Sequence, residues 1–206
     1  YFAVTVGDSY YLGLQKNFQL EGLAYRIIPM NADTVSKGVD TDIMYDNMMN
    51  KFRWGGVSNP KAYIDETVLR LCRTHRLMFA YLSDALIKKE KNDMALQALD
   101  RCMEVLPTQT VLVDYSCILL AKNYYKIGEQ AKADSLMREI ANNSIEKITW
   151  ILSLPDKMKN SVSRENSVQQ NLAILQNVYS ECDNYNSDLA NEIYKEFETL
   201  YYKLAD

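Results

Sequence analysis

The sequence predicts a mainly helical protein in which antiparallel helical hairpins follow a small N-terminal β-α-β segment. From residue 66 onward, long runs with apolar residues at helical spacing alternate with short polar, Gly- or Pro-containing breaks. The first residues instead combine β-branched and aromatic side chains, which is typical of strands. With 206 residues, 48% of them hydrophobic, the chain can bury one sizeable core.

Residues 1–32 are predicted to form the β-α-β segment. We expect a strand at residues 1–6, a short helix at 11–21 that Gly22 ends, and a second strand at 23–29. In such a unit the two strands are parallel, and the connection between them is right-handed. Because two strands alone are marginally stable, we interpret the segment as the remnant of a larger sheet, and the chain as a fragment of a longer protein.

Residues 33–64 are predicted to be a linking segment. After a polar loop, a helix runs from Asp40 to about Trp54, and a Gly- and Pro-containing loop follows. The Asp40-Thr-Asp42 triplet superficially resembles the metal-binding motif of some glycosyltransferases. Directly before a helix, however, such residues cap backbone N–H groups, and we interpret them as a cap.

Residues 65–206 are predicted to form one helical domain, with Asp65 capping its first helix. Short connections between long helices force antiparallel neighbours. The expected helices lie at residues 66–89, 92–106, 111–126, 129–152, 167–182 and 188–204.

An internal repeat supports the hairpin architecture. The intervals between Ser83, Ala95, Cys102 and Pro107 recur between Ala121, Ala133, Ile140 and Ile145. Small side chains fit where two helices cross closely, although the isoleucine at 140 departs from this pattern.

The spacing resembles the tetratricopeptide repeat, and a third, degenerate copy includes Ala190, Tyr194 and Phe197. The resemblance implies a superhelix of stacked hairpins. A generic helical bundle with alanines at its contacts is the alternative.

The chain offers little that could perform chemistry. His75 is the only histidine, and no partner for a nucleophile or a metal can be assigned to it. The four cysteines lie in helical patterns without metal-ligand spacing, so we expect them to pack in the core. We therefore predict no catalytic residues, no cofactor and no metal. The net charge of −4 argues against nucleic acid, and no apolar stretch is long enough for membrane insertion.

Two kinds of site are predicted. In tetratricopeptide arrays the first helix of each hairpin lines a concave groove that binds peptides or partner helices. The alternative is that the corresponding residues are ordinary solvated positions. The candidate groove residues are Asp84, Lys88, Tyr115, Lys122, Tyr125 and Lys126. Thr34, within Asp33-Thr-Val35, fits a short O-glycosylation pattern of Bacteroidetes.

The segments YLGLQKNFQLEGLAYRIIP (residues 11–29) and TDIMYDNMMNKFRWGG (residues 41–56) are distinctive. They resemble the C-terminal region of a family of polytopic membrane proteins of Bacteroidetes, a domain of unknown function. The membrane part of that family is similar to protein O-mannosyltransferases. The resemblance implies an upstream membrane domain and a periplasmic location at the inner membrane.

The resemblance leads to one functional expectation and one alternative. We expect a non-catalytic interaction domain of a membrane glycosyltransferase-like protein that binds acceptor protein or partner subunits. The alternative is a structural module of an envelope protein unrelated to glycosyl transfer.

Overall fold

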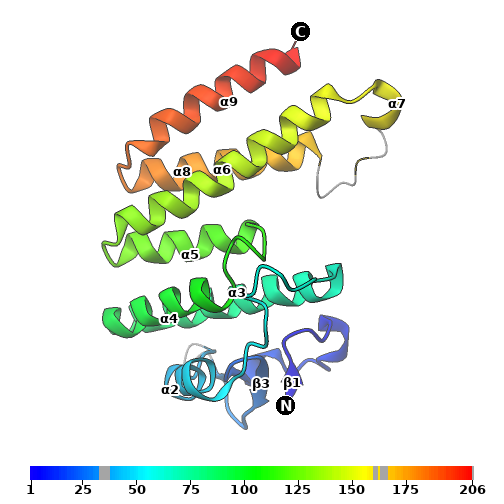
Figure 1. Cartoon of the computed structure of the whole chain (residues 1–206). Helices are drawn as coiled ribbons and strands as arrows, with labels where there is room; N and C mark the ends of the chain where they lie inside the picture. Colours follow the sequence, from blue (N-terminus) through cyan, green and yellow to red (C-terminus); the bar gives the residue numbers. More distant parts are fainter. Residues whose placement is uncertain (33–37, 160–161, 163–166, 206) are drawn as a thin grey trace. The chain divides into compact units, whose positions relative to one another are not determined.

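The computed structural model describes the chain except residues 33–37, 160–161, 163–166 and 206. The fold is mainly helical, with a small sheet near the N-terminus, as predicted (Figure 1). The chain divides into two compact units, Tyr1–Leu112 and Val113–Asp206, and the division falls within the segment predicted as one helical domain. In the described part of the chain, no helix is both long and apolar enough to span a membrane.

The N-terminal sheet has three antiparallel strands, β1 (Phe2–Ala3), β2 (Phe18–Leu20) and β3 (Ala24–Ile27). Their order is β1-β3-β2, and β3 pairs in antiparallel fashion with both neighbours. The predicted β-α-β crossover with parallel strands is therefore wrong.

The backbone explains why no helix forms at residues 11–21. Leu12 and Gly13 both have positive φ, 53° and 77°, and two successive left-handed residues cannot continue a right-handed helix. Between β1 and β2 the chain forms the short 3-10 turns η1 (Asp8–Tyr10) and η2 (Gln15–Asn17). The apolar residues predicted to form one face of a helix are thus divided between a turn and a strand.

An aromatic cluster stabilises this sheet. The Phe18 ring stacks on Tyr25 with centroids 5.3 Å apart and meets Tyr11 edge-on at 4.9 Å. Phe2 joins them at 5.2 Å from Phe18. Aromatic pairs of this kind add about 0.5–1.5 kcal/mol beyond their buried area, which helps a sheet of such short strands.

The segment after the sheet forms α2 (Thr41–Asp46) and then one π-helical turn, η3 (Asn47–Lys51). Asp40 caps α2 as predicted, because its carboxylate accepts a hydrogen bond from the Ile43 N–H at 3.0 Å. The Phe52 N–H bonds to the Asn47 carbonyl, which is the wide spacing of a π turn.

This segment is held against the turn between β2 and β3. Asn47 donates from Nδ2 to the Glu21 carbonyl at 2.6 Å. Gly22 has φ of 138°, and a Cβ at that position would lie 2.9 Å from the ring of Phe52. Only glycine combines this backbone conformation with so close an approach.

The first long hairpin consists of α3 (Glu66–Ile87) and α4 (Asn92–Val105), close to the predicted bounds. Asp65 caps α3 by accepting from the Val68 N–H at 2.9 Å. Ser83, Ala95 and Cys102, the small residues of the first predicted repeat, are completely buried.

Arg76 of α3 is also completely buried, and it holds the segment after α4. Its guanidinium donates to the Leu106 carbonyl at 2.8 Å and to the Leu112 carbonyl at 3.0 Å. A further hydrogen bond reaches the Val111 carbonyl. These carbonyls belong to a segment, residues 106–112, that has no regular secondary structure. The Arg76 side chain therefore supplies the donors that a helix or a sheet would otherwise provide.

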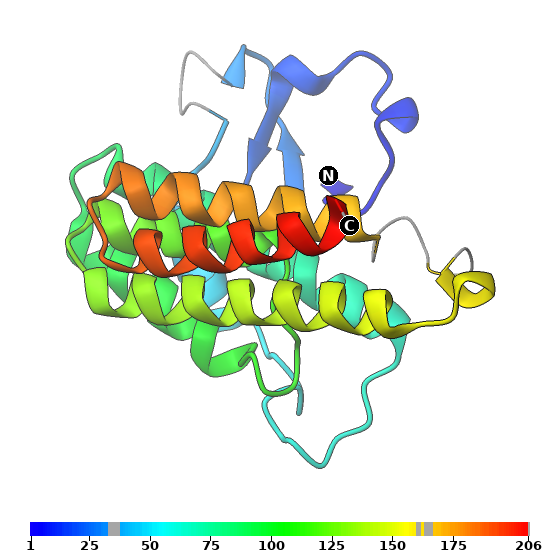
Figure 2. The same cartoon turned by 90° about the horizontal axis from the view of Figure 1, so that it is seen from above.

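The second unit contains α5 (Tyr115–Lys126), α6 (Gln130–Ser153), the short α7 (Asp156–Lys159), α8 (Val168–Asn184) and α9 (Leu189–Ala205). Figure 2 shows α6, α8 and α9 running side by side. Ala121 and Ala133, small residues of the second predicted repeat, are completely buried where α5 packs on α6.

Candidate functional site

A pocket of about 380 Å³ opens in the first unit, between the exit of η3 and the N-terminal half of α3. Its size is in the range of sites that take a small ligand or a large side chain. Apolar side chains form most of its wall. The lining residues are Leu23, Lys51, Phe52, Arg53, Trp54, Val57, Val68, Leu71, Cys72, His75 and Leu106.

One face of α3 supplies one side of the pocket. Val68, Leu71, Cys72 and His75 follow one another at the spacing that places side chains on one face of a helix. Val68 and Leu71 remain 36% and 38% exposed. The sequence indicates that these four residues lie on one face of an amphipathic helix, but it does not indicate a pocket beside them.

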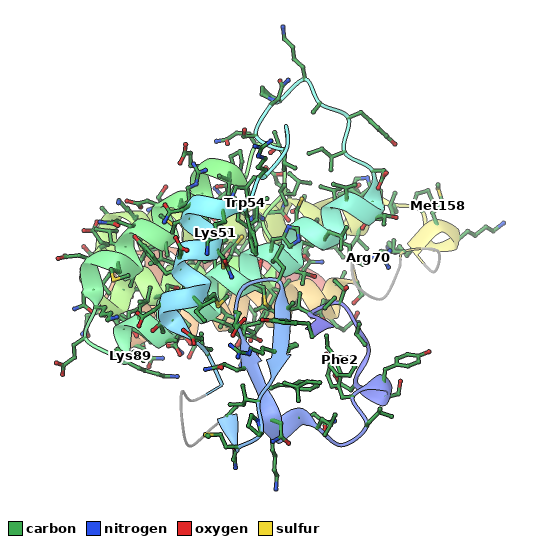
Figure 3. All side chains as sticks on the ribbon, turned by 90° about the horizontal axis from the view of Figure 1, so that it is seen from below. Phe2, Lys51, Trp54, Arg70, Lys89 and Met158 are labelled. Carbon is green, nitrogen blue, oxygen red and sulfur yellow. The ribbon has the colours of Figure 1, made fainter. Side chains whose placement is uncertain are left out.

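The opposite side comes from residues 52–57, which leave the π turn. The Trp54 ring packs on Phe79 with centroids 5.1 Å apart and meets His75 edge-on at 5.8 Å. Figure 3 shows Lys51 at the end of the π turn and Trp54 shortly after it, beside α3. The indole Nε1 of Trp54 is buried and has no hydrogen-bond acceptor among the described residues.

Two cationic side chains, Lys51 and Arg53, and the indole N–H donor of Trp54 contribute polar groups to the pocket. Lys51, Arg53, His75 and Trp54 line it, and no lining residue in this described region is acidic. Burial lowers the pKa of His75, so the imidazole is neutral at pH 7. Burial also raises the pKa of the Cys72 thiol, which keeps it protonated and a poor nucleophile.

The predicted groove residues are divided between the two units. In the first, Lys88 and Asp84 form an ion pair of 2.5 Å one turn apart on α3. In the second, Tyr115 is 55% exposed at the start of α5, and Lys126 is exposed at its end. Lys122 binds Glu181 of α8 at 2.6 Å, and this hydrogen bond raises the pKa of Lys122.

Tyr125 does not belong to a surface, contrary to its place among the predicted groove residues. It is 6% exposed, and its ring stacks on Tyr185 at 4.7 Å. Its hydroxyl donates to Asp134 at 2.5 Å, and Ser187 donates to the same oxygen at 2.6 Å. Burial, and then the bond to Asp134, raise the pKa of Tyr125 far above its usual range. These contacts join α5 and α6 to the connection between α8 and α9.

Other predicted features are located as follows. Thr34 lies outside the described residues. His75 is partly exposed in the middle of α3. All four cysteines are buried thiols. Within the described residues, no group of three His, Cys, Asp or Glu side chains could hold a metal ion.

The pocket combines an apolar wall with a basic rim, and burial keeps the Cys72 thiol protonated and the His75 imidazole neutral. No protein-family model matches the chain, and searches of curated proteins and of solved structures return no match.

Proposed function

We propose that the chain is a non-catalytic protein-interaction domain, and that the pocket between residues 52–57 and α3 receives a side chain of its partner. One observation carries the proposal. Val68 and Leu71 leave apolar surface exposed at the mouth of a pocket that is large enough for an aromatic side chain. Exposed apolar surface that continues into a pocket is the usual form of an interaction hot spot.

We also propose the setting and the finer fold implied by the resemblance described above. The domain would belong to a membrane glycosyltransferase-like protein, face the periplasm, and bind acceptor protein or partner subunits. The distinctive segment 41–56 supplies the pocket residues Lys51 to Trp54, which supports a link between the resemblance and binding. Buried small residues at the hairpin contacts support a tetratricopeptide-like superhelix.

Burial of the thiols fits this compartment. Free cysteines are uncommon in oxidising environments because exposed thiols form disulfides. In this chain each thiol is shielded, so oxidants reach it slowly.

The test is selection of binders from a random phage-displayed peptide library on the purified protein. We expect enriched peptides whose binding is lost in Leu71→Asp, because the substitution puts a charge at the pocket mouth. Leu112→Asp is the matched control, since this leucine is also exposed in the same unit but does not line the pocket. Peptides that bind both variants equally, or no enrichment at all, would contradict the proposal.

A further inference from the structure

The segment that supplies most of the pocket wall, residues 51–75, differs in charge from the whole chain. The chain carries a net charge of −4, yet residues 51–75 contain five Lys or Arg side chains and only two carboxylates. Both carboxylates are engaged within the unit. Asp65 caps α3, and Glu66 lies 3.5 Å from Arg73.

The cations at the rim differ in their availability. Lys51 forms an ion pair of 2.6 Å with Asp46. Arg53 is exposed and, within the described part of the chain, forms no ion pair. Arg70 does not line the pocket; it is exposed on α3, next to the lining residue Leu71 in sequence, and Figure 3 shows it on that helix. An arginine beside an apolar pocket can bind a carboxylate through two parallel hydrogen bonds.

From this arrangement we infer that the occupant is an acidic peptide segment anchored by one large apolar side chain. The inference rests on the proposed function and adds the chemistry of the partner. The anchor fills the space between Trp54 and the stripe of α3, where it contacts apolar atoms and the indole ring. Flanking carboxylates meet Arg53 at the rim, which favours acidic partners and disfavours basic ones.

Fluorescence of Trp54 can report binding directly. The chain has two tryptophans, and Trp150 lies in the other unit, so Trp150→Phe leaves Trp54 as the only reporter. Trp150 is 56% exposed, and its replacement by another aromatic residue should leave the fold intact. The probes are short capped peptides with a central Phe between aspartates, between serines or between lysines, and an aspartate peptide with Ala in place of the Phe.

We expect the aspartate–Phe peptide to bind about fivefold more tightly than the serine–Phe peptide at low salt, and the lysine–Phe peptide to bind most weakly. The preference for aspartate should shrink at high salt. Arg53→Ala should abolish most of it while leaving the affinity for the serine–Phe peptide within about twofold. Lys16→Ala, an exposed cation of the same unit outside the pocket lining, should change nothing.

The outcomes separate the inference from the proposed function. If all three Phe peptides bind equally, the acidic partner is refuted, while a pocket for an apolar anchor stands. If the Ala peptide binds as tightly as its Phe counterpart, the anchor is refuted. If no peptide changes the fluorescence or binds by calorimetry, both the inference and the proposed function fail.

Discussion

The buried guanidinium of Arg76 provides the sharpest test of how the first unit is held together. Replacing Arg76 by Met keeps a long, flexible side chain of similar reach but removes every donor. Three main-chain carbonyls, those of Leu106, Val111 and Leu112, then lose a charged partner. A buried acceptor left without a hydrogen bond costs about 1–3 kcal/mol.

The total should fall below the simple sum, because water and local movement will satisfy some of the carbonyls. The Leu112 bond is only partly buried, so its carbonyl is the one that water reaches most easily. We therefore expect Arg76→Met to lower the free energy of unfolding by about 3–5 kcal/mol, the lower part of the sum for three unsatisfied buried carbonyls. That is a large share of the stability of a small unit.

The assay is urea unfolding followed by Trp54 fluorescence in the Trp150→Phe background, so that the signal comes from the first unit alone. Arg70→Met is the matched control, since Arg70 is exposed on the same helix and should change stability by less than about 0.5 kcal/mol. A loss below about 1 kcal/mol in Arg76→Met, or an equal loss in both variants, would refute the reasoning.

Three further predictions concern other parts of the chain. Gly22→Ala should lower the free energy of unfolding in urea by about 2 kcal/mol, because φ is 138° and the new Cβ would lie 2.9 Å from an aromatic ring. Gly56→Ala is the control and should be nearly neutral, since its Cβ would have no atom within 4 Å. Asp134→Ala should cost about 2 kcal/mol in thermal unfolding, since the hydroxyls of Tyr125 and Ser187 lose their carboxylate acceptor and Tyr125 keeps only the weak acceptor Cys182 Sγ. Asp134→Asn keeps an acceptor, and an equal loss there would contradict this account. Burial lowers the pKa of His75 in the folded state, so its contribution to stability is present above about pH 6.5 and is lost as the pH falls. Below that pH, the unfolding midpoint should depend less steeply on pH in His75→Phe than in the unchanged protein. An unchanged pH dependence would count against this prediction.

The long helices of this fold could be predicted from the sequence because their signals are local. Asp40 and Asp65 cap helices where a side-chain acceptor precedes an apolar pattern. Ala95 and Ala133 are buried where small residues permit close packing. A capping residue lies only a few positions from the N–H group that it binds. The small residues at helix contacts recur at a fixed interval along the chain.

The N-terminal segment could not be predicted in this way. Leu12, Leu14 and Phe18 satisfy a helical pattern, but strand pairing decides their structure, and Phe18 lies opposite Ile27 in the sheet. The aromatic partners of Phe18 come from three different segments. The spacing of apolar residues along the sequence does not show which distant segments will supply these aromatic partners.

The candidate pocket escaped prediction for a related reason. Its walls come from the exit of a π turn and from α3, and no sequence signal marks the π turn at residues 47–51. Tyr125 shows the opposite error. A tyrosine at a position assigned to a groove was expected on the surface, but Asp134 supplies an acceptor for its hydroxyl and allows it to be buried.

The buried cysteines have a practical consequence for measurements on this protein. Thiolates are the nucleophiles that attack thiol-reactive labels. All four thiols are buried, and burial raises the pKa of Cys72 and brings that of Cys182 to about 11. At neutral pH the native thiols should therefore react slowly, without any need to remove them from the core. A single cysteine introduced at Tyr63, which is 93% exposed in the loop before α3, would then take up a spin label or dye selectively. Distances measured from that label would report how the loop moves when a peptide enters the neighbouring pocket.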